Sequence, residues 1–370
     1  MSSTRLLDDR ALRALVRRRF LDEVGAAPSD AVASPRERLA ALLREEAPLL
    51  AATRVGPLVD QLVSEVRGLG PLDAVLADPE VTEVMINGPG IAYVERSGVL
   101  GRVELDLDAD EILGIVERVV GPLGLRLDRS SPIVDARLAD GSRLNAVLPP
   151  LAVDGPCVTI RRFRAEPVTL EAFGAGPEVC GRLVRLVRSG WNVLVAGGTG
   201  AGKTTLLNAL SSFIDPGERL VTVEETAELR LAHAHWVRLE ARPANAEGAG
   251  QVTVRDLVRT ALRMRPDRLL VGEVRGGEAL DMLQALNTGH DGSLSTVHAN
   301  GPAEALLRLE TLVRFADAGL PVEAVRAQIA TALDAVVMVR RGSSGARRID
   351  SVSEVRAEPD GGPLRAHRLL

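Results

Sequence analysis

A short glycine-rich stretch holds the residue types that bind the phosphates of a nucleotide. Residues 197–204, Gly-Gly-Thr-Gly-Ala-Gly-Lys-Thr, fit the pattern G-x-x-x-x-G-K-[ST] and follow an apolar run at 191–196. Glycines let the backbone curl so that its N–H groups face phosphate oxygens, and the N-terminus of the following helix adds positive potential. The residues expected to hold ATP are Gly197, Gly198, Thr199, Gly200, Ala201, Gly202, Lys203, Thr204 and Thr205.

The lysine content of the chain supports this interpretation. Of 45 basic residues, one is lysine, Lys203, and it occupies the lysine position of the pattern. A chain that uses arginine almost everywhere has kept a compact ammonium at this place, where a planar guanidinium would fit poorly. We expect Lys203 to reach the β- and γ-phosphates of ATP, and the Thr204 hydroxyl to ligate the Mg²⁺ that accompanies the nucleotide. A glycine-rich turn without a ligand is the structural alternative.

Carboxylates lie at the ends of two other predicted strands of the same region. Because ligands of parallel α/β sheets lie at the carboxyl ends of the strands, we expect Glu224, Glu225 and Glu273 near the phosphates. Glu273 comes one residue later than the usual acid of a P-loop enzyme, with Gly272 in the usual place of the aspartate. Glu273 could orient the attacking water or accept its proton. The alternatives are a solvated carboxylate at a strand end for Glu273 and a surface acidic pair for the other two.

Histidines are rare, and two of the five flank one predicted strand. We interpret His290 and His298 as neutral hydrogen-bonding groups or as sensors of the γ-phosphate, with a histidine in the core or at a strand end as the alternative for either. His233 and His235 have the spacing of a metal-ligand pair, but no third ligand is indicated nearby, so we favour a structural role for both. Mg²⁺ held by Thr204 and the nucleotide is the metal that we expect.

Alternating strands and helices must position these residues. The last part of the chain has the βαβ pattern of a parallel sheet covered by helices, so the fold class is α/β. The predicted strands are 191–196, 219–225, 268–274, 293–299 and 334–341, and the helix after the P-loop is KTTLLNALSSFI. A terminal hairpin follows, with residues 342–345 as its turn.

Changes in sequence texture divide the chain into four regions. They are a small helical head over 1–68, a mixed α+β domain over 69–164, a linker over 165–173, and the P-loop domain over 174–370. The mixed α+β domain alternates short apolar runs with turn signals and one helical segment.

Apolar residues at helical spacing predict three helices in the head. The first covers 4–24, the second starts near residue 35, and the third covers 57–67. Ser34 is the expected N-cap of the second helix, and Pro57 the expected first residue of the third.

The composition restricts the functions open to the chain. It has 370 residues, 45 basic and 50 acidic side chains, a net charge of −5, and 2% aromatic residues. The acidic balance and the few aromatic rings disfavour binding to nucleic acid. Two cysteines are too few for a disulfide scaffold and fit a reducing cytoplasm. No stretch approaches the roughly 18 apolar residues of a membrane span, so we expect action at a membrane from outside the bilayer.

The motifs together resemble those of one known family, the secretion and pilus-assembly ATPases of the type II/type IV secretion superfamily. The resemblance runs from about residue 70 to 340 and is carried by VTEVMINGPGIAYVERSG, SSPIVDARLADGSRLNAVLPP, TIRRF, GGTGAGKTT, TVEETAEL and the block that ends in HANGPAEALLRLETL. It implies a RecA-like motor domain whose site residues are Lys203 and Thr204 as the Walker A pair, Glu224 and Glu225 as the acidic box, Glu273 as an atypical Walker B glutamate, and His290 and His298 as the His box. The tetracysteine zinc element of many type II secretion ATPases is missing, which favours the branch of Tad (Flp-type) pilus motors.

The same resemblance implies an assembly and partners. It implies a homohexameric ring at the cytoplasmic face of the membrane, peripherally attached through the platform proteins of a pilus or secretion machine, with no nucleic acid. Arginines near the hinge, by position Arg143, Arg161 and Arg162, would reach the nucleotide. The first hypothesis is therefore a motor whose ATP hydrolysis assembles, or also retracts, a Tad-type pilus. The alternatives are a type IV secretion ATPase that exports DNA or effector proteins, and a nucleotide-dependent switch without useful turnover.

Overall fold

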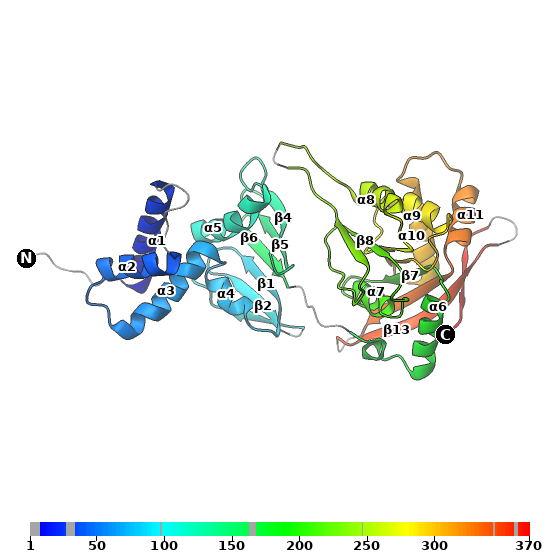
Figure 1. The fold of residues 1–370 in the computed structure, drawn as a ribbon, viewed down its shortest axis with the longest axis horizontal. Coiled ribbons are helices and arrows are strands. Elements are labelled where there is room, and N and C mark those ends of the chain that lie inside the picture. Colours follow the sequence, from blue (N-terminus) through cyan, green and yellow to red (C-terminus); the bar gives the residue numbers. More distant parts are fainter. Residues whose placement is uncertain are drawn as a thin grey trace, which may run out of the picture. The chain divides into compact units, whose positions relative to one another are not determined.

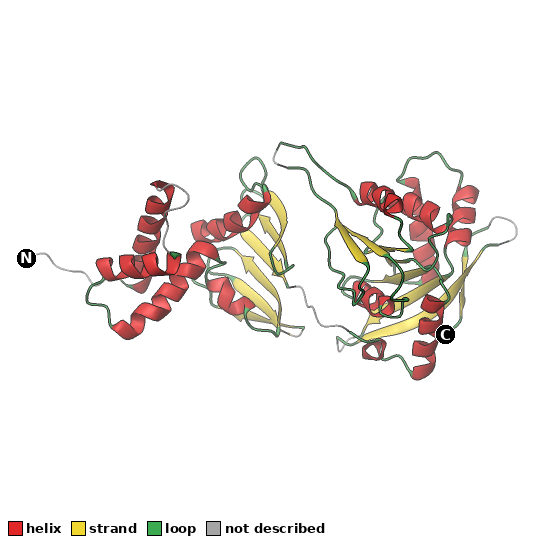
Figure 2. Cartoon of the chain, in the orientation of Figure 1, coloured by secondary structure: helices red, strands yellow, loops and turns green. Residues whose placement is uncertain are grey.

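The computed structural model describes residues 8–26, 34–96, 98–162, 168–245, 247–342, 345–358 and 362–370. The chain divides into two compact units, Met1–Phe163 and Arg164–Leu370 (Figures 1 and 2). Each unit has hydrophobic cores of its own. Among the described residues, no helix is long and apolar enough to cross a membrane.

Three helices at the start of the first unit pack around a small apolar core. They are α1 (Asp9–Ala26), α2 (Pro35–Glu46) and α3 (Ala52–Arg67). Val16, Leu39 and Leu62, one from each helix, are fully buried in this core. The three helices that the apolar spacing predicted are present, because each buries the stripe that the spacing defines. Residues 4–7 of the first predicted helix lie outside the described residues.

Two details of the helical head differ from the prediction. The Ser34 side chain makes no capping hydrogen bond, although α2 starts where expected. Helix α3 begins at Ala52, so Pro57 lies inside the helix and not at its first position. Val55 packs against the core of the head, and this apolar contact before the proline accounts for the earlier start.

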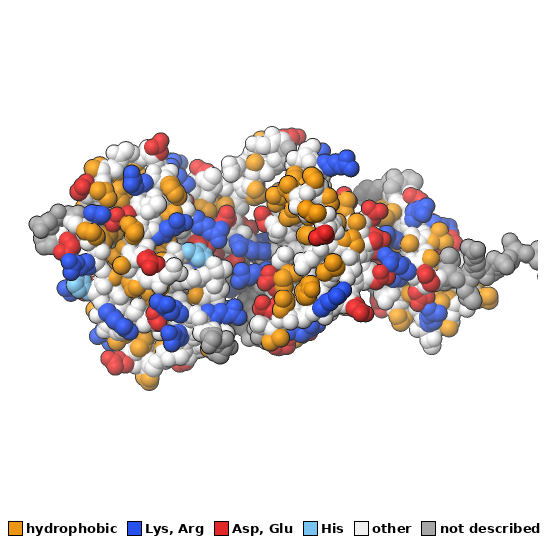
Figure 3. All heavy atoms as spheres, turned by 180° about the vertical axis from the view of Figure 1, so that it is seen from behind, with side chains coloured by type: hydrophobic (Ala, Val, Ile, Leu, Met, Phe, Trp, Pro, Cys, Tyr) orange, Lys and Arg blue, Asp and Glu red, His pale blue; other side chains and the backbone are white. Residues whose placement is uncertain are grey.

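The remainder of the first unit is a six-stranded antiparallel sheet with helices packed on it, which confirms the mixed α+β prediction. The strand order is β3-β2-β1-β6-β5-β4. The elements are β1 (Val81–Asn87), β2 (Ala92–Arg96), β3 (Val99–Val103), β4 (Ile133–Arg137), β5 (Arg143–Val147), β6 (Cys157–Arg161), α4 (Pro71–Leu76), α5 (Ala109–Val120) and the 3₁₀ helix η1 (Gly121–Leu123). Ile112 of α5 is buried against sheet residues such as Val84 and Ile160. Hydrophobic side chains also gather on the rear face of this unit (Figure 3).

The second unit is built on an eight-stranded sheet, in the order β14-β13-β12-β7-β11-β10-β8-β9. The strands are β7 (Val193–Gly197), β8 (Leu220–Glu224), β9 (Trp236–Glu240), β10 (Arg268–Val271), β11 (Leu294–His298), β12 (Ala335–Arg341), β13 (Arg347–Arg356) and β14 (Arg365–Arg368). Strands β12, β7, β11, β10, β8 and β9 run parallel, and β13 and β14 extend the sheet antiparallel from β12.

Helices cover both faces of this sheet. They are α6 (Pro177–Arg188), α7 (Lys203–Ser211), α8 (Val254–Ala261), α9 (Glu278–Leu286), α10 (Pro302–Arg314), α11 (Val322–Ala332) and the 3₁₀ helices η2 (Leu170–Phe173) and η3 (Leu262–Met264). Leu194 of β7 belongs to the core under α8 to α11, whereas its neighbour Val195 belongs to the core under η2, α6 and α7. This alternation is what a strand buried on both faces requires. The α/β prediction for this unit is confirmed.

The predicted strands of this unit are all present with ends shifted by a few residues, but other segments differ. Strands β9 and β14 were not predicted. Residues 165–167 of the expected linker lie outside the described residues, and residues 170–173 form η2 instead of an open connection. Leu170 and Phe173 are each 1% exposed, because both side chains pack into the core beside α6 and α7.

Candidate active site

The glycine-rich loop connects the carboxyl end of β7 to the first turn of α7. Gly200 and Gly202 have φ angles of +68° and +97°, a region that favours glycine, and α7 starts at Lys203. A Cβ atom on Gly197 would lie 2.5 Å from the carbonyl oxygen of Val339 in β12, so the first glycine permits the close approach of two strands. The loop therefore has the strand–loop–helix geometry that the sequence predicted for a phosphate cradle.

Lys203 is buried at the base of this loop, with 7% of its surface exposed. Its Nζ atom lies 3.3 Å from the Gly198 carbonyl oxygen and 3.0 Å from His298 Nε2 at the end of β11. An ammonium group has donors only, so this contact is a hydrogen bond in the neutral tautomer of His298 that carries its proton on Nδ1 and leaves Nε2 as the acceptor. Burial lowers the pKa of Lys203, and burial together with the nearby Lys203 charge lowers the pKa of His298.

Glu273, which follows β10, lies beside the same histidine. Its Oε1 atom is 2.9 Å from His298 Nε2, and its Oε2 atom accepts a hydrogen bond of 2.8 Å from Arg275 Nη2. Oε1 is buried and accepts no hydrogen bond from any residue that the structure describes. In the tautomer in which Nε2 accepts from Lys203, Oε1 has no donor among the described residues, and this carboxylate oxygen can accept a hydrogen bond from a water molecule.

Arg275 links the two acidic segments, and the sequence analysis missed it. Besides Glu273, it donates to Glu225 Oε2 through Nη1. Its backbone N–H donates to Glu278 Oε1 over 2.6 Å, which fixes the turn between β10 and α9. The hydrogen bond to Glu273 raises the pKa of Arg275. In the sequence, only its position two residues after Glu273 could have indicated that Arg275 belongs to the site. Its other partner, Glu225, is 50 residues away.

The two neighbouring glutamates at the end of β8 have different environments. Glu224 is 3% exposed, and its Oε1 accepts hydrogen bonds from the backbone N–H groups of Glu228 (2.9 Å) and Leu229 (3.0 Å). Burial raises the pKa of Glu224 to about 7. Glu225 is exposed and pairs with Arg275. Glu224 thus anchors the loop after β8.

Gly272 stands where a P-loop enzyme usually has an aspartate, and the structure gives a physical reason for the glycine. It pairs with the end of β8, and its backbone N–H donates to the Val223 carbonyl over 2.9 Å. A Cβ atom on Gly272 would lie 2.7 Å from Glu224 Cγ. The buried glutamate therefore occupies the space that any larger residue at position 272 would need.

The structure does not bring His290 to the phosphate loop. His290 lies in the turn before β11, where its Nδ1 is 3.0 Å from the Ala285 carbonyl oxygen. His298 lies at the other end of the same strand, beside Gly197. At about 3.3 Å per residue, the strand separates the two histidines by more than 13 Å. Within one chain, His290 contacts a carbonyl of the last turn of α9, and of these two histidines only His298 joins the site.

The three arginines expected to reach the nucleotide all belong to the first unit. Arg143 and Arg161 are paired positions of β5 and β6, so Arg143 begins a strand and is not in a turn. Arg162 follows β6, and its Nη1 donates to the carbonyl oxygens of Asp78 and Val81. Arg162 therefore has partners within its own unit.

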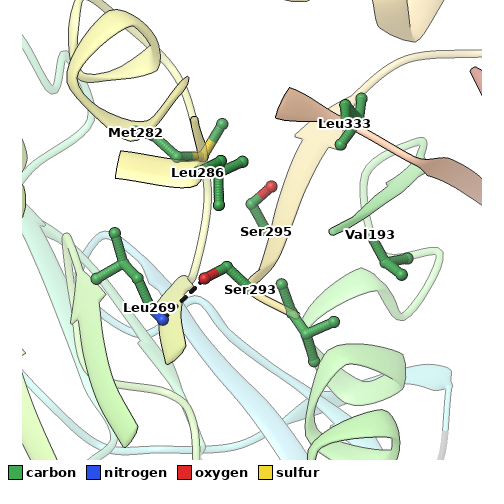
Figure 4. A pocket seen from close by; sticks show the side chains of 8 residues that line it. Val193, Leu269, Met282, Leu286, Ser293, Ser295 and Leu333 are labelled. Carbon is green, nitrogen blue, oxygen red and sulfur yellow. Dashed lines mark hydrogen bonds between the residues drawn. The ribbon is translucent and has the colours of Figure 1, made fainter. Parts of the chain in front are cut away.

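His233 and two cavities also lie in the described part of the second unit. His233 Nε2 lies 2.7 Å from the Glu218 carbonyl oxygen, and among the described residues no cluster of three His, Cys, Asp or Glu could hold a metal ion. A space between β10, β11 and α9 leaves no room for a water molecule (Figure 4). Ser293 Oγ accepts from the Leu269 N–H there over 2.9 Å. A larger cavity of about 240 Å³ adjoins the phosphate loop and the end of β12.

Comparisons with known proteins identify a matching family, relatives of similar sequence and solved structures of similar fold. The family model for type II/IV secretion system proteins matches residues 65–363. A protein of Mycobacterium tuberculosis provisionally named for conjugal transfer is 41% identical over 319 residues, 83% of this chain and 90% of that one. The conjugal transfer protein TrbB of Rhizobium radiobacter is 35% identical over 294 residues, 77% of this chain and 86% of that one. Among solved structures, the ATPase DotB of Legionella pneumophila has a similar fold, with a TM-score of 0.56 at 20% identity, over 78% of this chain and 80% of that one.

Proposed function

The chain belongs to the type II/IV secretion system protein family and is an ATPase, and we propose that it is the motor that drives a membrane-bound export or pilus-assembly machine. The observation that carries the proposal is the group formed by Lys203, His298 and Glu273 at the phosphate loop. It combines a buried ammonium, a neutral imidazole and a carboxylate. Lys203 Nζ lies 3.0 Å and Glu273 Oε1 lies 2.9 Å from His298 Nε2. Phosphoryl transfer to water needs a cation, a polar contact and a base of this kind.

The proposed reaction uses each of these groups once. A water molecule attacks the γ-phosphorus of ATP, its proton passes to the free Oε1 of Glu273, and the bond to the β–γ bridging oxygen breaks to give ADP and phosphate. Lys203 offsets the charge that grows on the phosphate oxygens. When the ammonium turns to the phosphates, the neutral His298 stays beside Glu273 and contributes a polar contact to the site.

The residues around the loop fit a nucleotide with its magnesium ion. The left-handed Gly200 and Gly202 leave the loop backbone open to phosphate oxygens, and the unpaired Glu273 oxygen needs a donor. When bound with ATP, Mg²⁺ would neutralise phosphate charge, and the Thr204 hydroxyl would be its protein ligand. From the first unit, Arg143 and Arg161 stay proposed nucleotide contacts on the family resemblance, and Arg162 donates to two carbonyl groups of its own unit.

Replacing Glu273 by glutamine tests this assignment. Glu273→Gln should keep ATP binding and lower the rate at saturating ATP by about 10² or more, because only the acceptor of the water proton is lost. Steady-state phosphate release and equilibrium binding of ATP measure the two effects. The matched control is Glu354→Gln, which removes a carboxylate of β13 that pairs with Arg356. A collapse of ATP affinity with an unchanged saturated rate would make Glu273 a binding residue.

The proposal also covers the assembly of the motor and the process that it drives. We propose a homohexamer at the cytoplasmic face of the membrane, attached to the platform proteins of the machine. Relatives named for conjugal transfer, and the type IV secretion system protein PtlH of Bordetella pertussis, favour export by a type IV secretion machine. The motifs that resemble Tad pilus motors favour pilus assembly as the second candidate. A host strain with Lys203→Ala should lose either DNA or protein export or surface pili, and the lost process identifies the load.

A further inference from the structure

The C-terminal hairpin of the second unit ends beside the phosphate loop. Strand β12 runs parallel to β7, and Val339 pairs with Gly197, the first residue of the loop. The carboxyl end of β12, with Arg341, therefore emerges at the same edge of the sheet as the loop. Strand β13 returns antiparallel and places Arg347 directly opposite Arg341. Figure 1 shows β13 and α7 in this part of the second unit.

Both arginines approach glycines of the loop. Arg347 Cδ lies 2.7 Å from the position that a Cβ atom on Gly202 would take, and Arg347 Nη1 donates to Thr205 Oγ1 over 3.3 Å. Arg341 Nη1 lies 3.7 Å from the corresponding position on Gly200. Gly200 and Gly202 are the two left-handed residues whose backbone forms the cradle. The two guanidinium groups therefore flank the cradle itself.

The order of the strands fixes which end of the nucleotide the hairpin faces. In the sheet order β12-β7-β11-β10, the hairpin lies on one side of β7, and His298 and Glu273 lie on the other side. Lys203 Nζ points to the second side, toward His298. Since the γ-phosphate must face the group that activates water, the hairpin side of the loop is left for the α- and β-phosphates.

The charges of the hairpin suit an anion at this place. Two guanidinium groups directly opposite each other on one face of a strand pair repel, and an anion held by both offsets the repulsion. Guanidinium also matches phosphate oxygens in geometry better than an ammonium does. The cavity of about 240 Å³ beside the loop is lined by Gly198, Thr199 and Arg341 among others, so it is open to the same ligand.

We propose that Arg341 and Arg347 bind the α- and β-phosphates of the nucleotide, so that the adjoining ends of β12 and β13 are part of the ATP site. The inference rests on the proposed function and adds two residues that bind nucleoside diphosphates and triphosphates alike. It differs from the role of Lys203, His298 and Glu273, which face the γ-phosphate. The two groups of residues should therefore separate ADP from ATP in a binding experiment.

The test measures the dissociation constants of fluorescent ADP and ATP analogues for the full chain by anisotropy. Arg341→Ala and Arg347→Ala should each weaken the binding of both nucleotides by about tenfold or more, and by the same factor for ADP and ATP, because charge-assisted hydrogen bonds to phosphate are lost. Arg347→Lys should recover part of the loss. The matched control is Arg348→Ala, the next residue of β13, which pairs with Asp350 and should bind both nucleotides like the parent chain.

Each outcome decides the inference. Trp191 and Trp236 both belong to the second unit, so their fluorescence during thermal unfolding checks that each variant folds. Unchanged ADP affinity in folded Arg341→Ala and Arg347→Ala chains overturns the inference and leaves the proposed function intact. A loss confined to ATP places the arginines at the γ-phosphate and also overturns it. A parent chain that binds neither nucleotide overturns the proposed function itself.

Discussion

Replacing Glu224 by glutamine should make the second unit more stable at alkaline pH. The carboxylate is 3% exposed, and burial raises its pKa to about 7 from an ordinary value of 4.5. Glutamine has the same shape and keeps an oxygen that can accept the N–H groups of Glu228 and Leu229. The variant therefore removes the buried negative charge and retains the anchor of the loop.

The size and the pH range of the effect follow from the two pKa values. Below pH 4.5, Glu224 is protonated in both the folded and the unfolded chain and has no effect. Between 4.5 and about 7, the folded state holds a proton that the unfolded state has lost, so the unfolding free energy falls as the pH rises. At about 1.4 kcal/mol per pKa unit, the full loss is about 3 kcal/mol and is complete above pH 7 to 8. The Glu224→Gln variant should not show this loss.

Urea unfolding followed by tryptophan fluorescence measures the effect, because both tryptophans lie in the second unit. The difference in unfolding free energy between Glu224→Gln and the parent chain should grow by about 3 kcal/mol in favour of glutamine from pH 4.5 to pH 8. All other titrating groups are shared and cancel in this difference. Glu225→Gln, which removes an exposed partner of Arg275, is the control and should cost at most about 1 kcal/mol. A difference that does not depend on pH would refute the argument that burial raises the pKa of Glu224.

Two further substitutions test the geometry of the site. Gly272→Ala should destabilise the second unit by about 1–3 kcal/mol in the same urea assay, because the new Cβ would meet Glu224 Cγ at 2.7 Å; Gly301→Ala, where nothing lies within 4 Å, should cost much less. Lys203→Arg should lose ATP hydrolysis almost as fully as Lys203→Ala in a phosphate-release assay, and normal turnover by the arginine variant would contradict the argument from the lone lysine.

The parts of the fold that the sequence predicted are those with a local signal. The phosphate loop, β7 and α7 follow one another in the chain, and the glycine, lysine and apolar pattern specifies them without distant contacts. Strand β9 was missed because it is a half-buried edge strand whose pairing with β8 is not visible in its own residues. Leu170 and Phe173 were assigned to a linker because the sequence does not show the helices that bury them.

The site shows the same division between local and long-range signals. Glu273 and His298 lie near the carboxyl ends of two predicted strands, so the parallel sheet places them together as expected. Arg275 and Arg347 gain their positions from partners 50 and 142 residues away, and the arginine-rich composition hides them. His290 was grouped with His298 because the two are close in the sequence, but strand β11 lies between them and places them at opposite edges of the sheet.

The use of lysine at position 203 and of arginine at positions 341 and 347 has a physical basis in the second unit. Lys203 is 7% exposed and lies against one carbonyl oxygen and one imidazole nitrogen, so a compact group with few donors is satisfied there. A guanidinium would bring five donors into the same space and leave several without a partner, at a cost of roughly 1–3 kcal/mol for each. Arg341 and Arg347 lie exposed on the hairpin, where water satisfies the extra donors and a planar fork matches phosphate. The position of lysine in this chain is therefore set by burial, and the positions of the two arginines by access to solvent beside the same loop.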